Sequence, residues 1–222
     1  MYYHLIPVPV SVVLIILYLI ARNRKDLKRT AIIQPLTTLL SIIVAALSFL
    51  SPQVNTGFTT WILVGLGLCL LADIFNIDMN NDKIFYAGIA VFIIAYLEYA
   101  VTYTVFNNGF HKPDIYVGIG FLLFYIFLMA TYWKGLGKYK LPIMIYGLIM
   151  PFMVTRAIST LFGGTFSLTA AILVTIGTTM LFIGDVEYGF FRFVKPGKFT
   201  FGPICYAGGQ LLIALSCAYF LG

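Results

Sequence analysis

Long apolar runs separated by short polar gaps dominate the hydrophobic pattern of this chain. Each run is long enough, at about 1.5 Å of rise per helical residue, to cross a hydrocarbon core of about 30 Å. A spanning segment must also satisfy its own backbone hydrogen bonds, which favours helices. The pattern therefore predicts an all-α bundle of eight transmembrane helices in one integral membrane domain, residues 1–222. The predicted helices cover residues 5–21, 31–50, 57–77, 84–106, 114–133, 141–161, 165–186 and 203–221.

Composition supports the membrane interpretation. The chain is 61% hydrophobic and 10% charged, whereas soluble domains carry about 25% charged residues. The net charge of +6 does not indicate a nucleic-acid partner, because the basic residues occupy short gaps between apolar runs. The first run is expected to be a retained helix, since its positive charges follow it and no small-residue cleavage site is present.

The distribution of basic residues predicts the orientation of the bundle. All of the 14 Lys and Arg residues except Lys112 and Arg156 lie after the first, third, fifth and seventh runs. Basic segments resist translocation, so these connections are expected to be cytoplasmic and both termini to lie on the opposite side.

The two halves of the chain resemble each other. ILVGLGLCLLAD at residues 62–73 parallels ILVTIGTTMLFIGD at residues 172–185, and Tyr-Ala-Gly recurs at residues 86–88 and 206–208. An offset of four helices preserves orientation, so the pattern predicts a parallel 4+4 internal repeat.

Two carboxylates, Asp73 and Asp185, stand near the ends of parallel predicted helices and at similar depths. Carboxylates inside a membrane bundle are costly, and they are usually functional or paired. Polar residues of other helices reach the same region, which predicts a pocket open toward the cytoplasm. The expected pocket residues are Gln34, Thr37, Thr38, Tyr146, Tyr206 and Gln210, with Tyr96, Glu98 and Tyr99 deeper.

Structural alternatives remain open for these charged groups. Asp73 could reach interfacial water or Lys83, and Asp185 could pair with Arg192 or Lys195. Glu98 could be protonated or buried against a partner, while Arg156 could be an interfacial anchor or that partner. The remaining acids are expected to be solvated loop or interfacial charges: Asp26, Asp78, Asp82, Asp114 and Glu187.

Other catalytic chemistries find little support in the sequence. His4 and His111 both fall outside the predicted bundle, and no paired-histidine zinc motif or nucleophile elbow occurs. We expect no metal site and no cofactor. The three cysteines lie in apolar runs without metal or disulfide spacing, so they are expected to be packing residues.

Several motifs together resemble the YhhN family of lysoplasmalogenase-like membrane proteins. Gln34-Pro35-Leu36-Thr37 is placed at the start of the second predicted helix, and a Gly-Asp spacing at Gly67 and Asp73 closes the third. Further matching elements are Tyr86-Ala-Gly with Phe92, Tyr96 and Tyr99; Gly177 with Phe182, Gly184-Asp185 and Arg192-Phe193; and Cys205-Tyr206-Ala-Gly with Gln210. The family usually has Lys at the position of Gln34 and His at that of Tyr96, so this chain departs from it there.

The resemblance implies that the protein hydrolyses the vinyl ether of a lysophospholipid. Its partners would then be this substrate and the membrane lipids. Such a bond breaks by proton transfer to carbon, which gives a cation that water captures, and two carboxylates can divide these roles. We expect Asp73, the deeper, to be the general acid and Asp185 the electrostatic partner. Tyr96, Tyr99, Tyr146 and Gln210 would line the site, with the headgroup near Lys138, Lys140, Arg192 or Lys195. A transporter or lipid sensor, and a hydrolase of another lipid ether or ester, are the alternatives.

Overall fold

A computed structural model describes residues 2–75, 81–198 and 201–221. The described chain is helical and contains no strand, which confirms the all-α prediction. Four short 3-10 turns flank or join the helices. The helices are α1 (Val8–Asn23), α2 (Leu27–Leu47), α3 (Thr56–Phe75), α4 (Asp82–Phe106), α5 (Pro113–Tyr132), α6 (Lys140–Ser159), α7 (Leu168–Phe193) and α8 (Gly202–Ser216).

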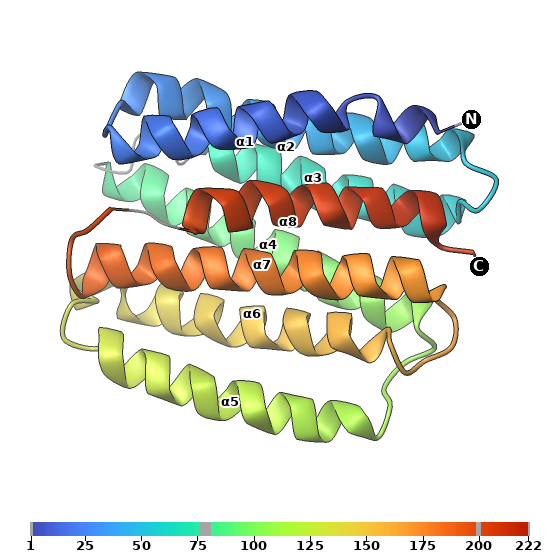
Figure 1. Ribbon diagram of the computed structural model, residues 1–222. Helices are drawn as coiled ribbons and strands as arrows, with labels where there is room; N and C mark the ends of the chain where they lie inside the picture. The colour runs from blue at the N-terminus through green and yellow to red at the C-terminus, as the bar shows by residue number, and fades with distance from the viewer. Residues whose placement is uncertain (1, 76–80, 199–200, 222) are drawn as a thin grey trace.

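Successive helices run antiparallel along one bundle (Figure 1). Both termini therefore lie at one end, and the connections rich in Lys and Arg lie at the other end, which we call the basic end. Seven of the described helices are long and apolar enough to span a membrane, and α8, with 15 residues, is shorter. The protein is thus a multi-pass integral membrane protein, while the assignment of the basic end to the cytoplasm stays a prediction.

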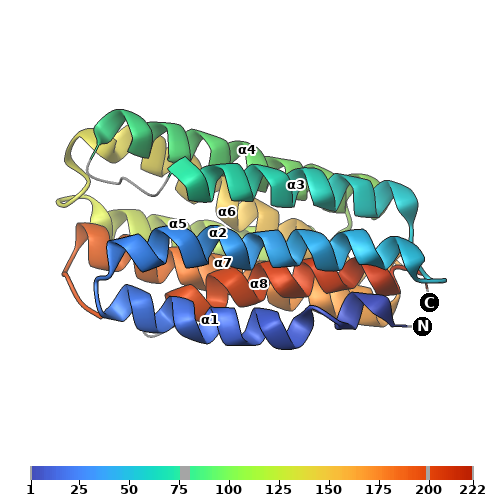
Figure 2. The same cartoon turned by 90° about the horizontal axis from the view of Figure 1, so that it is seen from above.

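The lateral order of the helices follows from their contacts. α8 packs against α1, α2 and α7, and α6 packs against α4, α5 and α7. Figure 1 shows α1 and α5 at opposite edges of the bundle, and Figure 2 shows α3 and α4 side by side along one face. α5 is the most peripheral helix, since of its residues only Asp114 and Tyr132 are buried.

Small residues bring α7 and α8 into backbone contact. A Cβ atom built on Gly177 would lie 2.7 Å from the Gly209 carbonyl oxygen, and one on Gly209 would lie 2.5 Å from the Gly177 oxygen. These glycines are a packing face, as small residues often are between membrane helices. Close packing explains why most of α8 is buried although it is short.

Some helix boundaries differ from the prediction. α2 begins four residues early because Asp26 accepts a hydrogen bond from the backbone N–H of Arg29 at 3.0 Å and caps the helix. Pro35 therefore lies inside α2 and does not open it. α7 extends seven residues beyond the expected end, to Phe193. Residues 76 and 77 of the third predicted helix, and Asp78, lie outside the described residues.

The extension of α7 places Asp185 about two turns before the helix end, deeper than expected. Polar residues in these last turns have partners within the protein. Glu187 accepts hydrogen bonds from the backbone N–H groups of Phe201 and Gly202, and Arg192 lies over the ring of Phe85 at 5.2 Å. The predicted internal repeat is not established by this arrangement and stays a prediction.

Candidate functional site

Asp73 is held in the last turn of α3 by three donors from two other helices. Gln34 Nε2 donates to Asp73 Oδ1 at 2.6 Å, and Thr38 Oγ1 donates to Oδ2 at 2.5 Å, both from α2. Tyr206 of α8 donates its hydroxyl to Oδ1 at 2.7 Å. The carboxylate is only 1% exposed. All three partners donate, which is the arrangement that suits an ionised acceptor.

Asp185 of α7 is held differently. The hydroxyls of Tyr96 in α4 and Tyr146 in α6 donate to it at 2.7 and 2.6 Å, and both reach the same oxygen, Oδ2. The two tyrosine rings stack with centroids 5.6 Å apart. Both tyrosines thus converge on one oxygen of the carboxyl group.

A short aromatic chain joins the surroundings of the two carboxylates. The ring of Phe92 lies 6.0 Å from that of Tyr206, which binds Asp73, and 5.8 Å from that of Tyr96, which binds Asp185. The two acids are therefore connected through the side chains that bind them, near the basic end.

A cavity of about 120 Å³ opens beside Asp185. Its wall is mostly aromatic and aliphatic, which is typical of sites for small apolar ligands. Asp185 is the one acidic residue among its described lining residues, and Asp73 is not part of the wall. The polar lining residues are Tyr18, Arg22, Gln34, Tyr125, Tyr132, Tyr146, Asp185, Tyr188 and Tyr206.

The predicted substrate residues divide into two groups. Gln34, Tyr146 and Tyr206 line the cavity, and Tyr96 reaches Asp185 without lining it. The other three do not line the cavity. Thr37 donates its hydroxyl to its own helix, Tyr99 stacks on Tyr103, and Gln210 is fully buried with no hydrogen-bond partner for its amide among the described residues.

None of the four cations expected at the headgroup lines the cavity. Lys138 instead pairs with Asp82, and Lys140 lies over the ring of Trp133 at 4.4 Å. The cation that does line the cavity is Arg22 of α1. Arg22 and Tyr18 were not identified as site residues from the sequence. Their spacing was a usable signal, because two polar residues one helical turn apart on an apolar helix share one face.

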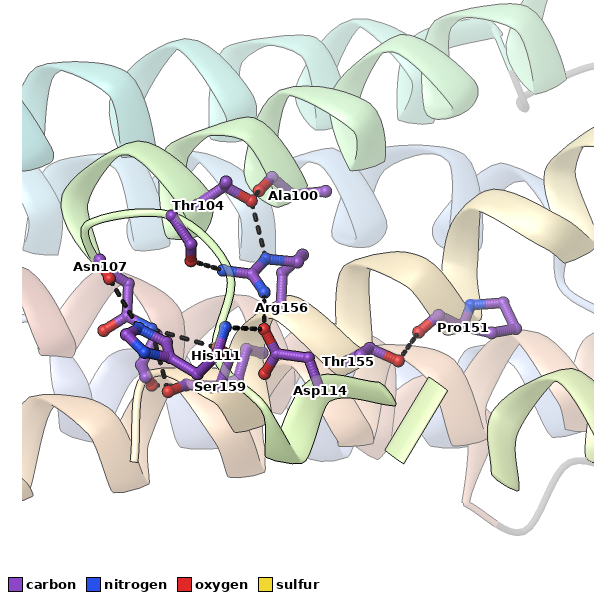
Figure 3. Close-up of polar contacts among 12 residues, drawn as sticks. Ala100, Thr104, Asn107, His111, Asp114, Pro151, Thr155, Arg156 and Ser159 are labelled. Atoms are coloured by element: carbon purple, nitrogen blue, oxygen red, sulfur yellow. Dashed lines mark hydrogen bonds and ion pairs between the residues drawn. The ribbon is translucent and has the colours of Figure 1, made fainter. Parts of the chain in front are cut away.

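Arg156 belongs to a separate buried cluster near the end of the bundle that carries the termini (Figure 3). Its guanidinium is fully buried, donates to Thr104 Oγ1 at 2.8 Å and to the Gly109 carbonyl, and forms an ion pair with Asp114. The prediction that Asp114 is solvated is wrong, since it is 7% exposed and also accepts from the His111 backbone N–H at 2.8 Å. A buried guanidinium requires such a partner.

Glu98 does not line the cavity, and the cation considered as its partner pairs with Asp114 instead. Glu98 lies in the middle of α4, where Thr102 donates to Oε1 at 2.7 Å. Its Oε2 is buried without a hydrogen-bond partner among the described residues and faces Gly65 of α3, where an added Cβ would lie 2.2 Å away. Arg156 therefore does not pair with it.

Comparisons with known proteins complete the description of the site. In the described part of the chain, no group of three or more His, Cys, Asp or Glu side chains could hold a metal ion. No curated protein and no solved structure matches the chain. The model of the YhhN family matches residues 29–217, which include both aspartates and all their hydrogen-bond partners. On this match over most of its length, the chain belongs to the YhhN family.

Proposed function

We propose that the protein hydrolyses the vinyl ether of a lysophospholipid within the membrane. The observation that carries the proposal is the carboxyl group of Asp185, which lines a mostly apolar cavity at the basic end. Water-poor apolar surroundings and a proton donor are what protonation of an alkenyl carbon requires. The protein's membership in the YhhN family supports the same activity by resemblance.

The geometry favours a division of roles opposite to the one that depth alone suggested. A general acid must come within hydrogen-bond reach of the reacting atom, and Asp185 lines the cavity whereas Asp73 does not. We therefore assign the proton transfer to Asp185. Asp73 accepts a hydrogen bond from the hydroxyl of Tyr206, which lines the cavity, and so fixes the position of that side chain. Asp73 also acts as a fixed negative charge near the developing cation.

The reaction balances with water as the only co-reactant. Asp185 donates its proton to the alkenyl carbon remote from the ether oxygen, which leaves an oxocarbenium ion. Water adds to the carbon that bears oxygen and loses one proton to Asp185, and the resulting hemiacetal splits. The products are a fatty aldehyde and the glycerophospho-headgroup. Tyr146, which donates to Asp185 and lines the cavity, is placed to orient the water.

The pattern of partners also supports the predicted internal repeat. Asp73 of α3 is held from α2 and α8, and Asp185 of α7 is held from α6 and α4. Under an offset of four helices these pairs correspond. We propose that the site is built from two related halves, in which one aspartate has kept cavity access and the other serves as a support.

The test uses purified protein with an alkenyl lysophospholipid, and with its saturated alkyl ether as the matched inert lipid. The reaction is run in heavy water, and the released aldehyde is reduced immediately and analysed by mass spectrometry. Protonation at carbon predicts one solvent deuterium on the carbon next to the aldehyde carbon. Asp185→Asn is expected to lower the rate by about 100-fold or more, the usual contribution of a general acid.

Asp82→Asn, at a half-exposed position of the basic end, is the matched control and should retain the rate. Folding of each variant is checked by its thermal melting. A folded Asp185→Asn protein that releases aldehyde at the wild-type rate would refute the proposal. Binding of the lipid without any aldehyde would favour a transporter or sensor instead, and release of a fatty acid from an ester lipid would favour another lipid hydrolase.

A further inference from the structure

The cavity crosses the bundle sideways and changes character along its course. Its lining residues come from α1 and α2 at one edge, from α8, α7 and α4, and from α6 and α5 at the other edge. The α1 edge carries Tyr18, Arg22 and Gln34. The α5 edge carries no charged side chain: its lining residues are Leu128, Met129, Ile143, Gly147 and Met150, with Tyr125, Tyr132 and Tyr146, whose hydroxyls donate to other groups of the protein. An elongated molecule with one polar end fits this gradient.

Arg22 differs in its burial from the basic residues that follow it between the end of α1 and the first turn of α2. The four basic residues that follow it are exposed: Arg24, Lys25, Lys28 and Arg29. Arg22 is partly buried, lies over the ring of Tyr188 at 5.7 Å and is the one basic residue among the described lining residues of the cavity. It also precedes residues 29–217, so the family match does not predict it.

At the opposite edge of the cavity a glycine lets side chains of α5 pack directly against the backbone of α6. A Cβ atom on Gly147 of α6 would lie 3.1 Å from the Tyr125 ring and 3.2 Å from the terminal methyl of Met129, both on α5. Gly147 lies seven residues into α6, about 10 Å from the helix start. The apolar arm of the cavity therefore reaches into the hydrocarbon region and is lined on one side by the peripheral helix.

We propose that Arg22 binds the phosphate of a single-chain phospholipid whose chain lies in the arm beside Gly147. This placement rests on the proposed function, because it sets the scissile bond next to Asp185, which α7 contributes between the two edges. A guanidinium matches phosphate in charge and can donate two parallel hydrogen bonds to it. Arg22 is thus a specificity residue, which selects phosphate-bearing lipids over neutral ones.

Binding is measured with ligands that the proposed reaction cannot cleave, using the full chain in lipid nanodiscs. The probes are an alkyl lysophospholipid, the neutral alkylglycerol of the same chain length, and the glycerophospho-headgroup without a chain. Arg22→Gln is expected to weaken binding of the lysophospholipid by about 10-fold or more, since it removes a charged hydrogen-bond donor. Binding of the alkylglycerol should not change, and Arg22→Lys should retain much of the preference.

Lys28→Gln removes an exposed charge from the same end and is the matched control. An equal loss in Lys28→Gln would indicate a general surface charge effect and overturn the proposal. Equal loss of both lipids in Arg22→Gln would indicate a structural role, and no loss of either would also refute it. Strong binding of the headgroup alone would identify a site for free phosphate compounds and contradict the lipid assignment.

The arm is tested by chain length. Gly147→Leu should reduce affinity for long-chain lysophospholipids by more than for short-chain ones, because the new side chain displaces Tyr125 and Met129, which line this edge of the cavity. Equal effects on both chain lengths would place the chain elsewhere. These outcomes are independent of turnover, so intact binding without aldehyde release would reject the proposed function and leave the Arg22 site standing.

Discussion

Removal of Arg156 tests whether the cluster near the termini is held by a buried ion pair. The guanidinium is fully buried and connects three elements, since it donates to Thr104 of α4, to the Gly109 carbonyl and to Asp114 of α5. It also lies over the ring of Phe110 at 4.3 Å. Arg156→Met keeps most of the side-chain volume and deletes every one of these polar contacts.

The expected loss of unfolding free energy in Arg156→Met follows from the contacts that Asp114 keeps. Asp114, 7% exposed, would keep the His111 backbone N–H and lose its cation. Breaking one side of a buried ion pair costs about 3–5 kcal/mol, because the other charge stays buried and uncompensated. The Lys138–Asp82 pair is the contrast, since its side chains are 58% and 47% exposed. Lys138→Met should therefore destabilise the protein much less than Arg156→Met does.

The free energy of unfolding is measured for the purified variants in mixed micelles by denaturing-detergent titration. The double variant Arg156→Met with Asp114→Asn separates charge from packing. It should be more stable than Arg156→Met alone by about 1 kcal/mol or more, because no unpaired charge is then buried.

Two results would refute this reasoning. Arg156→Met could prove no more destabilising than Lys138→Met, which would mean that the guanidinium contributes no more than a surface charge. Alternatively, Asp114→Asn could fail to restore any stability to the Arg156 variant. In that case the loss would come from packing around Phe110 and not from the buried carboxylate.

The remaining predictions concern the supports of the site. Thr38→Val removes one donor from buried Asp73 and should cost about 1.5–3 kcal/mol of unfolding free energy, whereas Thr37→Val, whose hydroxyl bonds its own helix, should cost less than about 1 kcal/mol. Similar losses for both threonines would contradict the hydrogen-bond account. Gly177→Ala should destabilise the α7–α8 contact by about 1–3 kcal/mol, because its methyl group meets the backbone of α8. Gly67→Ala, whose methyl meets nothing within 4 Å, should show no loss by the same titration, and a loss there would contradict the packing argument.

The sequence by itself determined the architecture to a large extent. Apolar runs of spanning length have one stable form in a membrane, so their number and approximate limits are set by local composition. The distribution of Lys and Arg separated the two ends of the bundle. Asp73 and Asp185 stood out as carboxylates in apolar helices, where a charge needs partners. Depth along the helices placed Gln34, Thr38, Tyr146 and Tyr206 near them.

Only the tertiary structure decided which residue faces which neighbour. Depth along a helix is fixed by the count of residues, but the direction of a side chain around the helix depends on which helices pack against it. That is why Thr38 and not Thr37 reaches Asp73, and why Asp114 is buried against Arg156 instead of solvated. The cavity beside Asp185 and the position of Arg22 in its wall also depend on helix packing, because the cavity is lined by residues from more than five helices.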